Sequence, residues 1–182
     1  MNKSGSLSKG LFIVIISTVL STLLVNLIGK RDLLTTKENL SSHIEEFKTN
    51  DQNKVTVVLK RKIGEQYVLL YTSKGMNDNI GIAYYVKTDL FPFYELIRDE
   101  EAQNPILGSS FLNNDQFIVY GNVKDTRAEY FKYRNYIDYK KVNLPKGPYF
   151  LHVETYEGKQ LSVPLVTLYS EEGKVVAAAP AQ

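Results

Sequence analysis

The feature that most constrains this chain is an uninterrupted apolar run near its start. Residues 10–29 (GLFIVIISTVLSTLLVNLIG) number twenty and carry no charge. A helix that rises about 1.5 Å per residue spans roughly 30 Å over this length, which matches the hydrocarbon core of a bilayer. The run therefore predicts an N-terminal transmembrane helix and a location at the cell membrane.

The end of the run favours a retained signal-anchor over a cleaved signal peptide. A cleaved signal has an apolar core of about 7–15 residues and then a small-x-small site. Residues 27–31 (LIGKR) contain no such site, and the best internal one, residues 19–21 (VLS), would cut inside the apolar run. A pilin-type leader would need a glutamate where this chain has Ile15. Cleavage remains the alternative.

The flanking charges leave the orientation open. Basic residues both precede the run (Lys3, Lys9) and follow it (Lys30, Arg31, Lys37), and the count slightly favours a cytoplasmic C-terminal side. Long domains, however, cross largely regardless of charge, and the head before the run is short. We expect a single-pass protein with residues 1–9 in the cytoplasm and the C-terminal domain extracytoplasmic.

One face of the predicted anchor is polar. Ser17 and Ser21 are four residues apart, as are Thr18 and Thr22, and residues with this spacing share a helix face. Small hydroxyl residues allow two membrane helices to approach and to hydrogen-bond. These four are candidate helix-association residues; alternatively, their hydroxyls bond back to the carbonyls of their own helix.

The charge balance changes once the anchor is set aside. The chain carries a net charge of +2, but four of its 22 basic residues flank the run, and all 20 acidic residues follow it. From Asp32 onward 18 basic residues face 20 acidic ones, a balance of −2. Bulk attraction to nucleic acid is therefore not expected. The chain has no cysteine, so disulfides, thiolate metal sites and a lipidated cysteine are excluded.

The hydrophobic pattern divides the chain into five segments. We expect a head (1–9), the anchor (10–29), a membrane-proximal helix and linker (30–53), a β domain (54–176) and a flexible tail (177–182). A helix is predicted over 33–50, with the capping-box spacing of Thr35 and Glu38 and an apolar stripe at Leu40, Ile44 and Phe47.

The β domain is predicted from alternating, β-branched and aromatic segments with turn residues between them. Together they predict a mainly β fold, an antiparallel sandwich or twisted sheet of about eight strands. The segment 91–104 stays ambiguous, because Pro92 suits a first helical turn and Asp99–Glu101 suits an exposed charged end, and a loop is expected to follow it at 107–110. The predicted strands are 54–60, 67–72, 80–87, 116–123, 127–134, 136–143, 149–156, 160–169 and 174–176.

Several of these segments carry a resemblance. Residues 67–72 (YVLLYT), 119–123 (VYGNV), 147–150 (GPYF) and 172–176 (EGKVV) occur in the order found in small exported or membrane-anchored β-rich proteins of Bacillus-like Gram-positive bacteria, a group that lacks an assigned activity. The resemblance covers about residues 54–176. It implies a β-rich extracytoplasmic domain and no catalytic residues. Relatives often carry a tryptophan after the third strand, and this chain has none.

Catalytic patterns are not found in the sequence. Gly108-Ser109-Ser110 lacks the second glycine of a nucleophile elbow, and the two histidines, His43 and His152, are too few for a histidine metal site. His152 alternates with Leu151 and Val153 and is expected to face solvent. Asp78 and the acidic run 99–101 read as solvated turns. We expect no cofactor, no metal and no enzyme activity.

The segment 124–146 combines cations with aromatic residues. Tyr130, Lys132 and Arg134 are expected on one strand face, with Phe131 and Tyr133 on the other. Cations beside aromatic rings suit a polyanion; alternatively, the lysines blunt an exposed strand edge. The candidate anion-binding residues are Lys132, Arg134, Lys140 and Lys141.

These observations give three hypotheses. The first is a non-enzymatic, single-pass membrane protein whose extracytoplasmic β domain is an interaction module for another membrane or envelope protein, with the lipid bilayer as its first partner. The second is a binding module for an anionic envelope polymer or lipid headgroups. The third is an envelope hydrolase with carboxylates dispersed along the sequence.

Overall fold

The computed structural model describes residues 12, 14–21, 31–75, 78–89, 92–113, 116–135, 138–155 and 163–179. The chain divides into two compact units, Met1–Leu34 and Thr35–Gln182.

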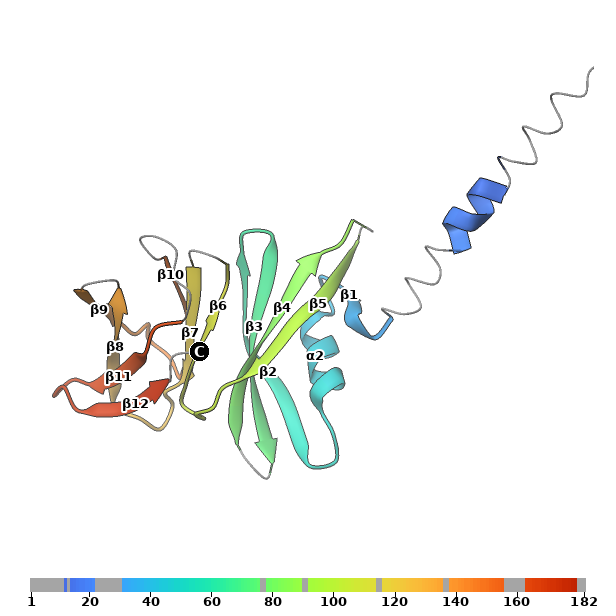
Figure 1. Cartoon of the computed structure of the whole chain (residues 1–182). Coiled ribbons are helices and arrows are strands. Elements are labelled where there is room, and N and C mark those ends of the chain that lie inside the picture. The colour runs from blue at the N-terminus through green and yellow to red at the C-terminus, as the bar shows by residue number, and fades with distance from the viewer. Residues whose placement is uncertain are drawn as a thin grey trace, which may run out of the picture. The chain divides into compact units, whose positions relative to one another are not determined.

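In the first unit, residues 14–21 are helical (Figure 1). Their large apolar side chains are exposed, from Ile16 at 46% to Val14 at 62%. The 3-10 helix η1 follows at Arg31–Leu33. Among the described residues, no helix is both long enough and apolar enough to cross a membrane. Residues 10, 11, 13 and 22–29 of the predicted anchor lie outside the described residues.

The rest of the chain is mainly β, as the sequence predicted. In its described part, twelve strands form three antiparallel sheets. Sheet A has the strand order β1-β5-β4-β3-β2, sheet B the order β10-β7-β6, and sheet C the order β12-β11-β8-β9. The strands are β1 (Leu34–Thr36), β2 (Asn53–Ile63), β3 (Gln66–Gly75), β4 (Asn79–Lys87), β5 (Phe93–Glu101), β6 (Leu107–Phe111), β7 (Gln116–Asn122), β8 (Ala128–Asn135), β9 (Asp138–Asn143), β10 (Tyr149–Thr155), β11 (Val166–Ser170) and β12 (Val175–Ala179).

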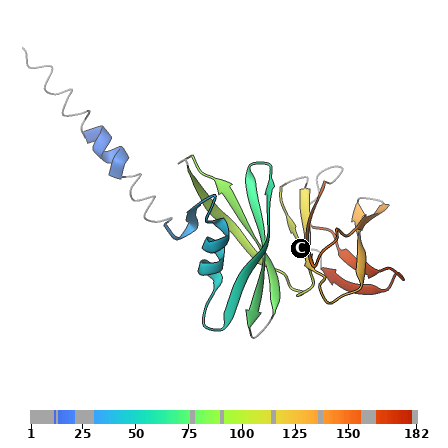
Figure 2. The ribbon, with the colours of Figure 1, turned by 180° about the vertical axis from the view of Figure 1, so that it is seen from behind.

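Sheet B lies between the other two sheets, as Figures 1 and 2 show from opposite sides. Its central strand β7 is therefore buried on both faces. Phe117 and Val119 belong to the apolar cluster shared with sheet C, whereas Ile118 and Tyr120 belong to the one shared with sheet A. A strand covered on both faces needs consecutive apolar residues, and β7 (QFIVYGN) has them.

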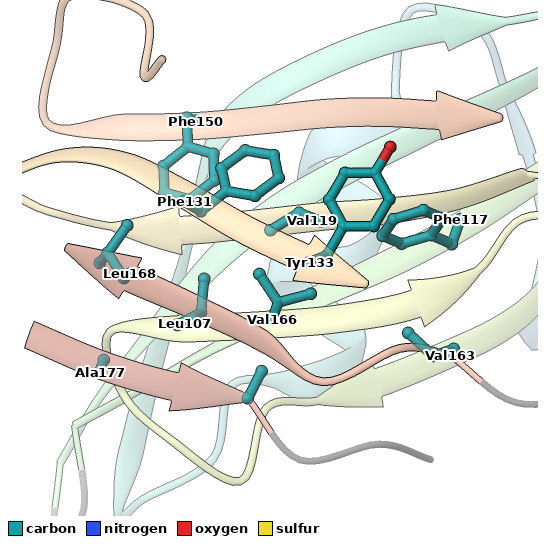
Figure 3. Packing of buried hydrophobic residues seen from close by; sticks show 11 residues of the cluster. Leu107, Phe117, Val119, Phe131, Tyr133, Phe150, Val163, Val166, Leu168 and Ala177 are labelled. Atoms are coloured by element: carbon teal, nitrogen blue, oxygen red, sulfur yellow. The ribbon is translucent and has the colours of Figure 1, made fainter. Parts of the chain in front are cut away.

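The cluster between sheets B and C is aromatic at its centre. Phe131 and Tyr133 of β8 project toward Phe117 and Val119 of β7 (Figure 3). The rings of Phe117 and Tyr133 meet edge to face with centroids 5.0 Å apart, a favourable aromatic geometry. Phe150 of β10 stacks on Phe131. This packing fixes the inner face of β8, and with it the residues that β8 presents outward.

The helix α2 (Leu40–Lys48) packs against sheet A. Leu40 and Ile44 are fully buried. Glu45 accepts a hydrogen bond from the Val57 backbone N–H at 2.7 Å, and His43 Nδ1 lies 2.7 Å from the Tyr85 hydroxyl. Apolar burial together with these bonds joins α2 to the sheet, so the helix belongs to the β unit and not to a separate linker.

Several sequence predictions need correction. The predicted helix over 33–50 is shorter, and its N-cap is Asn39 without a side-chain bond, so the capping box does not form. Phe47 of the predicted stripe is 49% exposed. Residues 93–101 form strand β5, because pairing with β4 outweighs the helical signal of Pro92. The loop expected at 107–110 is strand β6.

The C-terminal prediction also changes. Strand β12 continues through Ala179, and Ala177 and Ala179 are buried against the cluster of sheets B and C. Small side chains there fit a closely packed position. Three residues of the segment expected to be a flexible tail therefore belong to strand β12, and two of them are part of the core. Residues 180–182 lie outside the described ones.

Candidate functional site

Strand β8 places two of the predicted cations on the outside of sheet C. Phe131 and Tyr133 are fully buried, whereas Lys132 is half-buried and Arg134 is exposed. Successive side chains of a strand point to opposite faces, so Lys132 and Arg134 share the face that points away from the core. We call it the outer face of sheet C. The predicted alternation along this strand is confirmed.

Lys141 of β9 joins this face, because the strand register pairs it directly with Lys132. Residues directly opposite on neighbouring antiparallel strands project from the same side of a sheet. On the other side of β8, Tyr169 of β11 pairs with Tyr130. The two tyrosine rings stack with centroids 5.3 Å apart and 11° between their planes.

Both ammonium groups lie over these rings. Lys141 Nζ is 4.0 Å from the Tyr130 centroid. Lys132 Nζ is 5.7 Å from the Tyr130 centroid and 5.4 Å from that of Tyr169. The negative face of an aromatic ring attracts a cation at these distances. We call Tyr130, Lys132, Lys141 and Tyr169 the cation–tyrosine cluster.

Lys140 is not part of this cluster. Its register partner is Tyr133, whose side chain enters the core, so Lys140 projects from the opposite face. Lys140 and Lys141 were both predicted to bind the anion, but side chains adjacent along a strand point to opposite faces. Of the four predicted anion-binding residues, the structure brings Lys132, Lys141 and Arg134 to one face and leaves Lys140 on the other.

The cluster lysines have no carboxylate partner within the part of the chain that the structure describes. The ion pairs found there join Lys48 to Asp99 and Glu101, Arg98 to Glu100, and His152 to Glu154. Like charges on directly opposed residues destabilise a sheet. The contacts of both ammonium groups with the tyrosine rings offset part of that repulsion, and an anion held between the two lysines would remove it.

A pocket of about 360 Å³ opens beside the cluster. It shares Tyr130 and Lys141 with the cluster and adds residues from three segments. Tyr169, Glu129 and Glu171 were not among the predicted site residues, because strand register and bulges decide which distant residues meet and a single sequence does not show them. The lining residues are Glu129, Tyr130, Lys141, Asn143, Leu144 and Glu171.

A second pocket, of about 220 Å³, lies between an end of sheet A and the loops of sheet B. Its polar lining is engaged locally. Asp78 accepts a bond from the Gly75 N–H, and Asn122 accepts one from the Lys124 N–H. Such bonds are typical of side chains that stabilise turns, so Asp78 and Asn122 have a structural role in this pocket.

His152 was predicted to face solvent, but its side chain is only 32% exposed. Its ring packs edge to face on Phe131, and its Nε2 lies 2.6 Å from Glu154 Oε1. The other oxygen of Glu154 accepts a 2.6 Å bond from the Tyr133 hydroxyl. The alternation of residues in β10 predicted that the face bearing His152 is open to solvent. Sheet C packs against that face and covers part of it. This chain of bonds joins sheets B and C.

The acidic run 99–101 is likewise not a solvated turn. It lies in strand β5, where Asp99 accepts a 2.5 Å bond from the Tyr71 hydroxyl and pairs with Lys48 at 2.6 Å. Burial opposes the charge on Lys48, but its bonds to Asp99 and Glu101 outweigh burial and raise the pKa of the ammonium. Burial and the bond to Asp99 raise the pKa of Tyr71. These groups tie α2 to sheet A.

The candidate helix-association residues are only partly described. Ser17, Thr18 and Ser21 lie in the helical residues 14–21, and Thr22 lies outside the described residues. The Thr18 hydroxyl donates a 2.8 Å bond to the Val14 carbonyl. That bond is the back-bonding alternative raised from the sequence, and it satisfies the hydroxyl within its own helix.

Neither a metal-ligand group nor a similar known protein was found for this chain among the described residues and the three comparisons. Across the described ranges, no group of three or more His, Cys, Asp or Glu side chains is placed to hold a metal ion. Comparison of the chain with protein-family models, with curated proteins and with solved structures found no match in any of the three. The proposals below therefore depend on the geometry of the chain itself.

Proposed function

We propose that the protein is a membrane-anchored interaction module of the cell envelope, and that the outer face of sheet C binds an anionic envelope polymer. The observation that carries the proposal is the cation–tyrosine cluster. Lys132 and Lys141 lie directly opposite each other on the neighbouring strands β8 and β9. Both contact the stacked tyrosine rings, and neither has a carboxylate partner among the described residues. A polymer that bears regularly spaced phosphates or carboxylates supplies the missing counter-charge.

The arrangement favours an extended ligand. Arg134 lies two residues along β8 from Lys132, so three cations lie on one open sheet face. The tyrosine rings give this face a planar apolar surface against which a sugar or other flat group can pack. Because the domain balance from Asp32 onward is −2, attraction depends on this local cluster and not on net charge.

The anchor is part of the same proposal. The helical residues 14–21 expose Val14, Ile15 and Leu20 without a protein surface over them, each by more than half. Apolar side chains in such a state suit a lipid environment. With the resemblance to exported Gram-positive proteins, this supports a single-pass, cell-membrane location with the β domain outside the cytoplasm, where envelope polymers lie.

The test is salt-dependent retention of the full chain, in nonionic detergent, on beads that carry polyphosphate. We expect the double variant Lys132→Gln/Lys141→Gln to bind at least about tenfold more weakly than wild type at low salt. The matched control is Lys140→Gln/Lys146→Gln, which removes the same charge from exposed positions off the cluster and should retain binding. If both variants lost the same amount of polyphosphate binding, net charge alone would explain the retention and the proposal would be refuted.

A protein partner is a second candidate, because the outer face also exposes large apolar side chains. Tyr139, which pairs with Arg134, is 72% exposed, and Val175, which pairs with Tyr169, is 63% exposed. Crosslinking in intact cells before solubilisation tests it. A crosslinked species that disappears in Tyr139→Ser/Val175→Ser and survives in Lys132→Gln/Lys141→Gln would favour a protein over a polymer.

A further inference from the structure

We propose that the pocket beside the cation–tyrosine cluster binds a zwitterionic group, an anion joined through a short linker to an ammonium. This inference deepens the proposed function, because it names the chemistry of the repeating unit that the outer face of sheet C recognises. It rests on three observations: a cation in the lining of the pocket, two carboxylates in the same lining, and a size suited to a small polar group.

The cation is Lys141. Its Nζ lies 4.0 Å from the centroid of the Tyr130 ring, and both residues line the pocket, so a positive charge lies where the cluster and the pocket meet. Asn143, two residues along β9 and in register with Tyr130, adds an amide to the same lining. An ammonium and an amide N–H are the donors that a phosphate or carboxylate needs.

The first carboxylate, Glu129, is aimed by a β-bulge. The register between β8 and β11 pairs Tyr169 with Tyr130 and Ser170 with Ala128, so Glu129 is the extra residue without a partner strand position. A bulge re-aims the side chain of its extra residue. Here Glu129 and its neighbour Tyr130 line the same pocket, as expected when a bulge interrupts the alternation of side chains. The Glu129 carbonyl accepts a bond from the Leu144 N–H and holds this geometry.

The second carboxylate, Glu171, comes from the turn that joins β11 to β12. Gly173 takes a positive φ of 77° in this turn, and its N–H donates to the Ser170 carbonyl. The Ser170 hydroxyl donates to Glu172 at 2.9 Å, so Glu172 is used inside the turn. Glu171 lines the pocket instead.

The lining of the pocket therefore carries charges of both signs that do not pair with one another within 4.0 Å. Among the residues that the structure describes, neither Glu129 nor Glu171 has a Lys, Arg or His partner within 4.0 Å, and Lys141 has no Asp or Glu partner within that distance. A simple anion would gain from Lys141 and lose from the two carboxylates. A ligand with an ammonium a few bonds from its anion gains from all three, so the geometry selects a zwitterion over a plain anion.

The experiment measures binding of three small ligands to the full chain in nonionic detergent. Phosphoethanolamine carries both charges, glycerol phosphate carries only the anion, and ethanolamine carries only the ammonium. We expect phosphoethanolamine to bind at least about tenfold more tightly than either single-charge ligand. Glu129→Gln/Glu171→Gln should abolish that preference. The same variant should bind polyphosphate more tightly than wild type, because two repelling charges are gone.

The matched control is Glu38→Gln/Glu65→Gln, which removes two exposed carboxylates outside the pocket and should change neither ligand preference nor polyphosphate retention. Equal affinity for glycerol phosphate and phosphoethanolamine would overturn the inference while leaving polymer retention intact. Polyphosphate retention unaffected by Lys132→Gln/Lys141→Gln would instead overturn the proposed function. Vesicles with phosphatidylethanolamine, compared with soluble phosphoethanolamine, distinguish a lipid headgroup from a polymer unit as the source.

Discussion

Ser109 of β6 illustrates how a single side chain departs from the rule that buried polar groups are paired. Its hydroxyl is buried and has no hydrogen-bond partner among the described residues. Its register partner is Val119, on the face that packs into the cluster of sheets B and C. A buried hydroxyl without a hydrogen-bond partner lowers the stability of the folded state, because it loses its bonds to water and gains none in the protein.

We therefore expect Ser109→Ala to raise the free energy of unfolding by about 1 kcal/mol. The neighbouring Ser110→Ala is the contrast, because the Ser110 Oγ accepts a 2.8 Å bond from the buried Tyr84 hydroxyl. Its loss should lower stability by about 1–2 kcal/mol. Denaturant unfolding of the full chain in nonionic detergent measures both, and a destabilised Ser109→Ala would mean that this hydroxyl has a partner.

Gly81 of β4 is required by a close approach. A Cβ at this position would lie 2.4 Å from Oη and Cζ of Tyr71, because the Tyr71 ring crosses Gly81 to reach Asp99 on the next strand. We expect Gly81→Ala to lower stability by about 2–4 kcal/mol through the displaced ring and its lost bond. In a Tyr71→Leu background the same change should cost clearly less, which a double-mutant cycle measures; equal costs in both backgrounds would contradict the contact.

For the helix α2, burial predicts which of its apolar residues matter. Ile44 is fully buried on sheet A, whereas Phe47 is 49% exposed and stacks on His43. Ile44→Ala should cost about 2–4 kcal/mol and Phe47→Ala less than about 1 kcal/mol. Thermal unfolding gives both values. Hydrogen exchange adds a local readout, since α2 amides should lose protection in Ile44→Ala before those of β7 do.

The helices and strands also show which parts of the fold the sequence could predict. The sequence correctly predicted the strands that have clear alternation and turn residues at their ends. The period of two also predicted which side chains of β8 point outward. Strand β5 was not, because its Pro92 and charged end resemble a helix, and only pairing with β4 and the bond from Tyr71 to Asp99 explain a strand there. The partner of Tyr130 was missed for a similar reason: Tyr169 reaches it only through the register of β11.

The layered arrangement of the three sheets places tyrosine hydroxyls where water is scarce. Tyr71, Tyr85 and Tyr120 are nearly or fully buried, and burial raises the pKa of each above its ordinary value of 10.0. Burial also raises the pKa of Tyr84 to about 12, although its bond to Ser110 and the nearby Arg98 act in the opposite direction. In the unfolded chain, all four phenols return to ordinary values.

The protein should therefore unfold steeply in alkali. Above about pH 10 the unfolded state releases these phenolic protons while the folded state keeps them, so the unfolded state binds fewer protons and stability falls as pH rises. Each tyrosine contributes a slope of about 1.4 kcal/mol per pH unit, or about 5.5 kcal/mol per pH unit for the four. Tyr84 ceases to contribute above about pH 12, where it ionises in the folded state too. Denaturant unfolding at stepped pH measures the slope, and Tyr120→Phe should reduce it by about one proton. Stability that stays level from pH 9 to about pH 11 would contradict the burial of these hydroxyls.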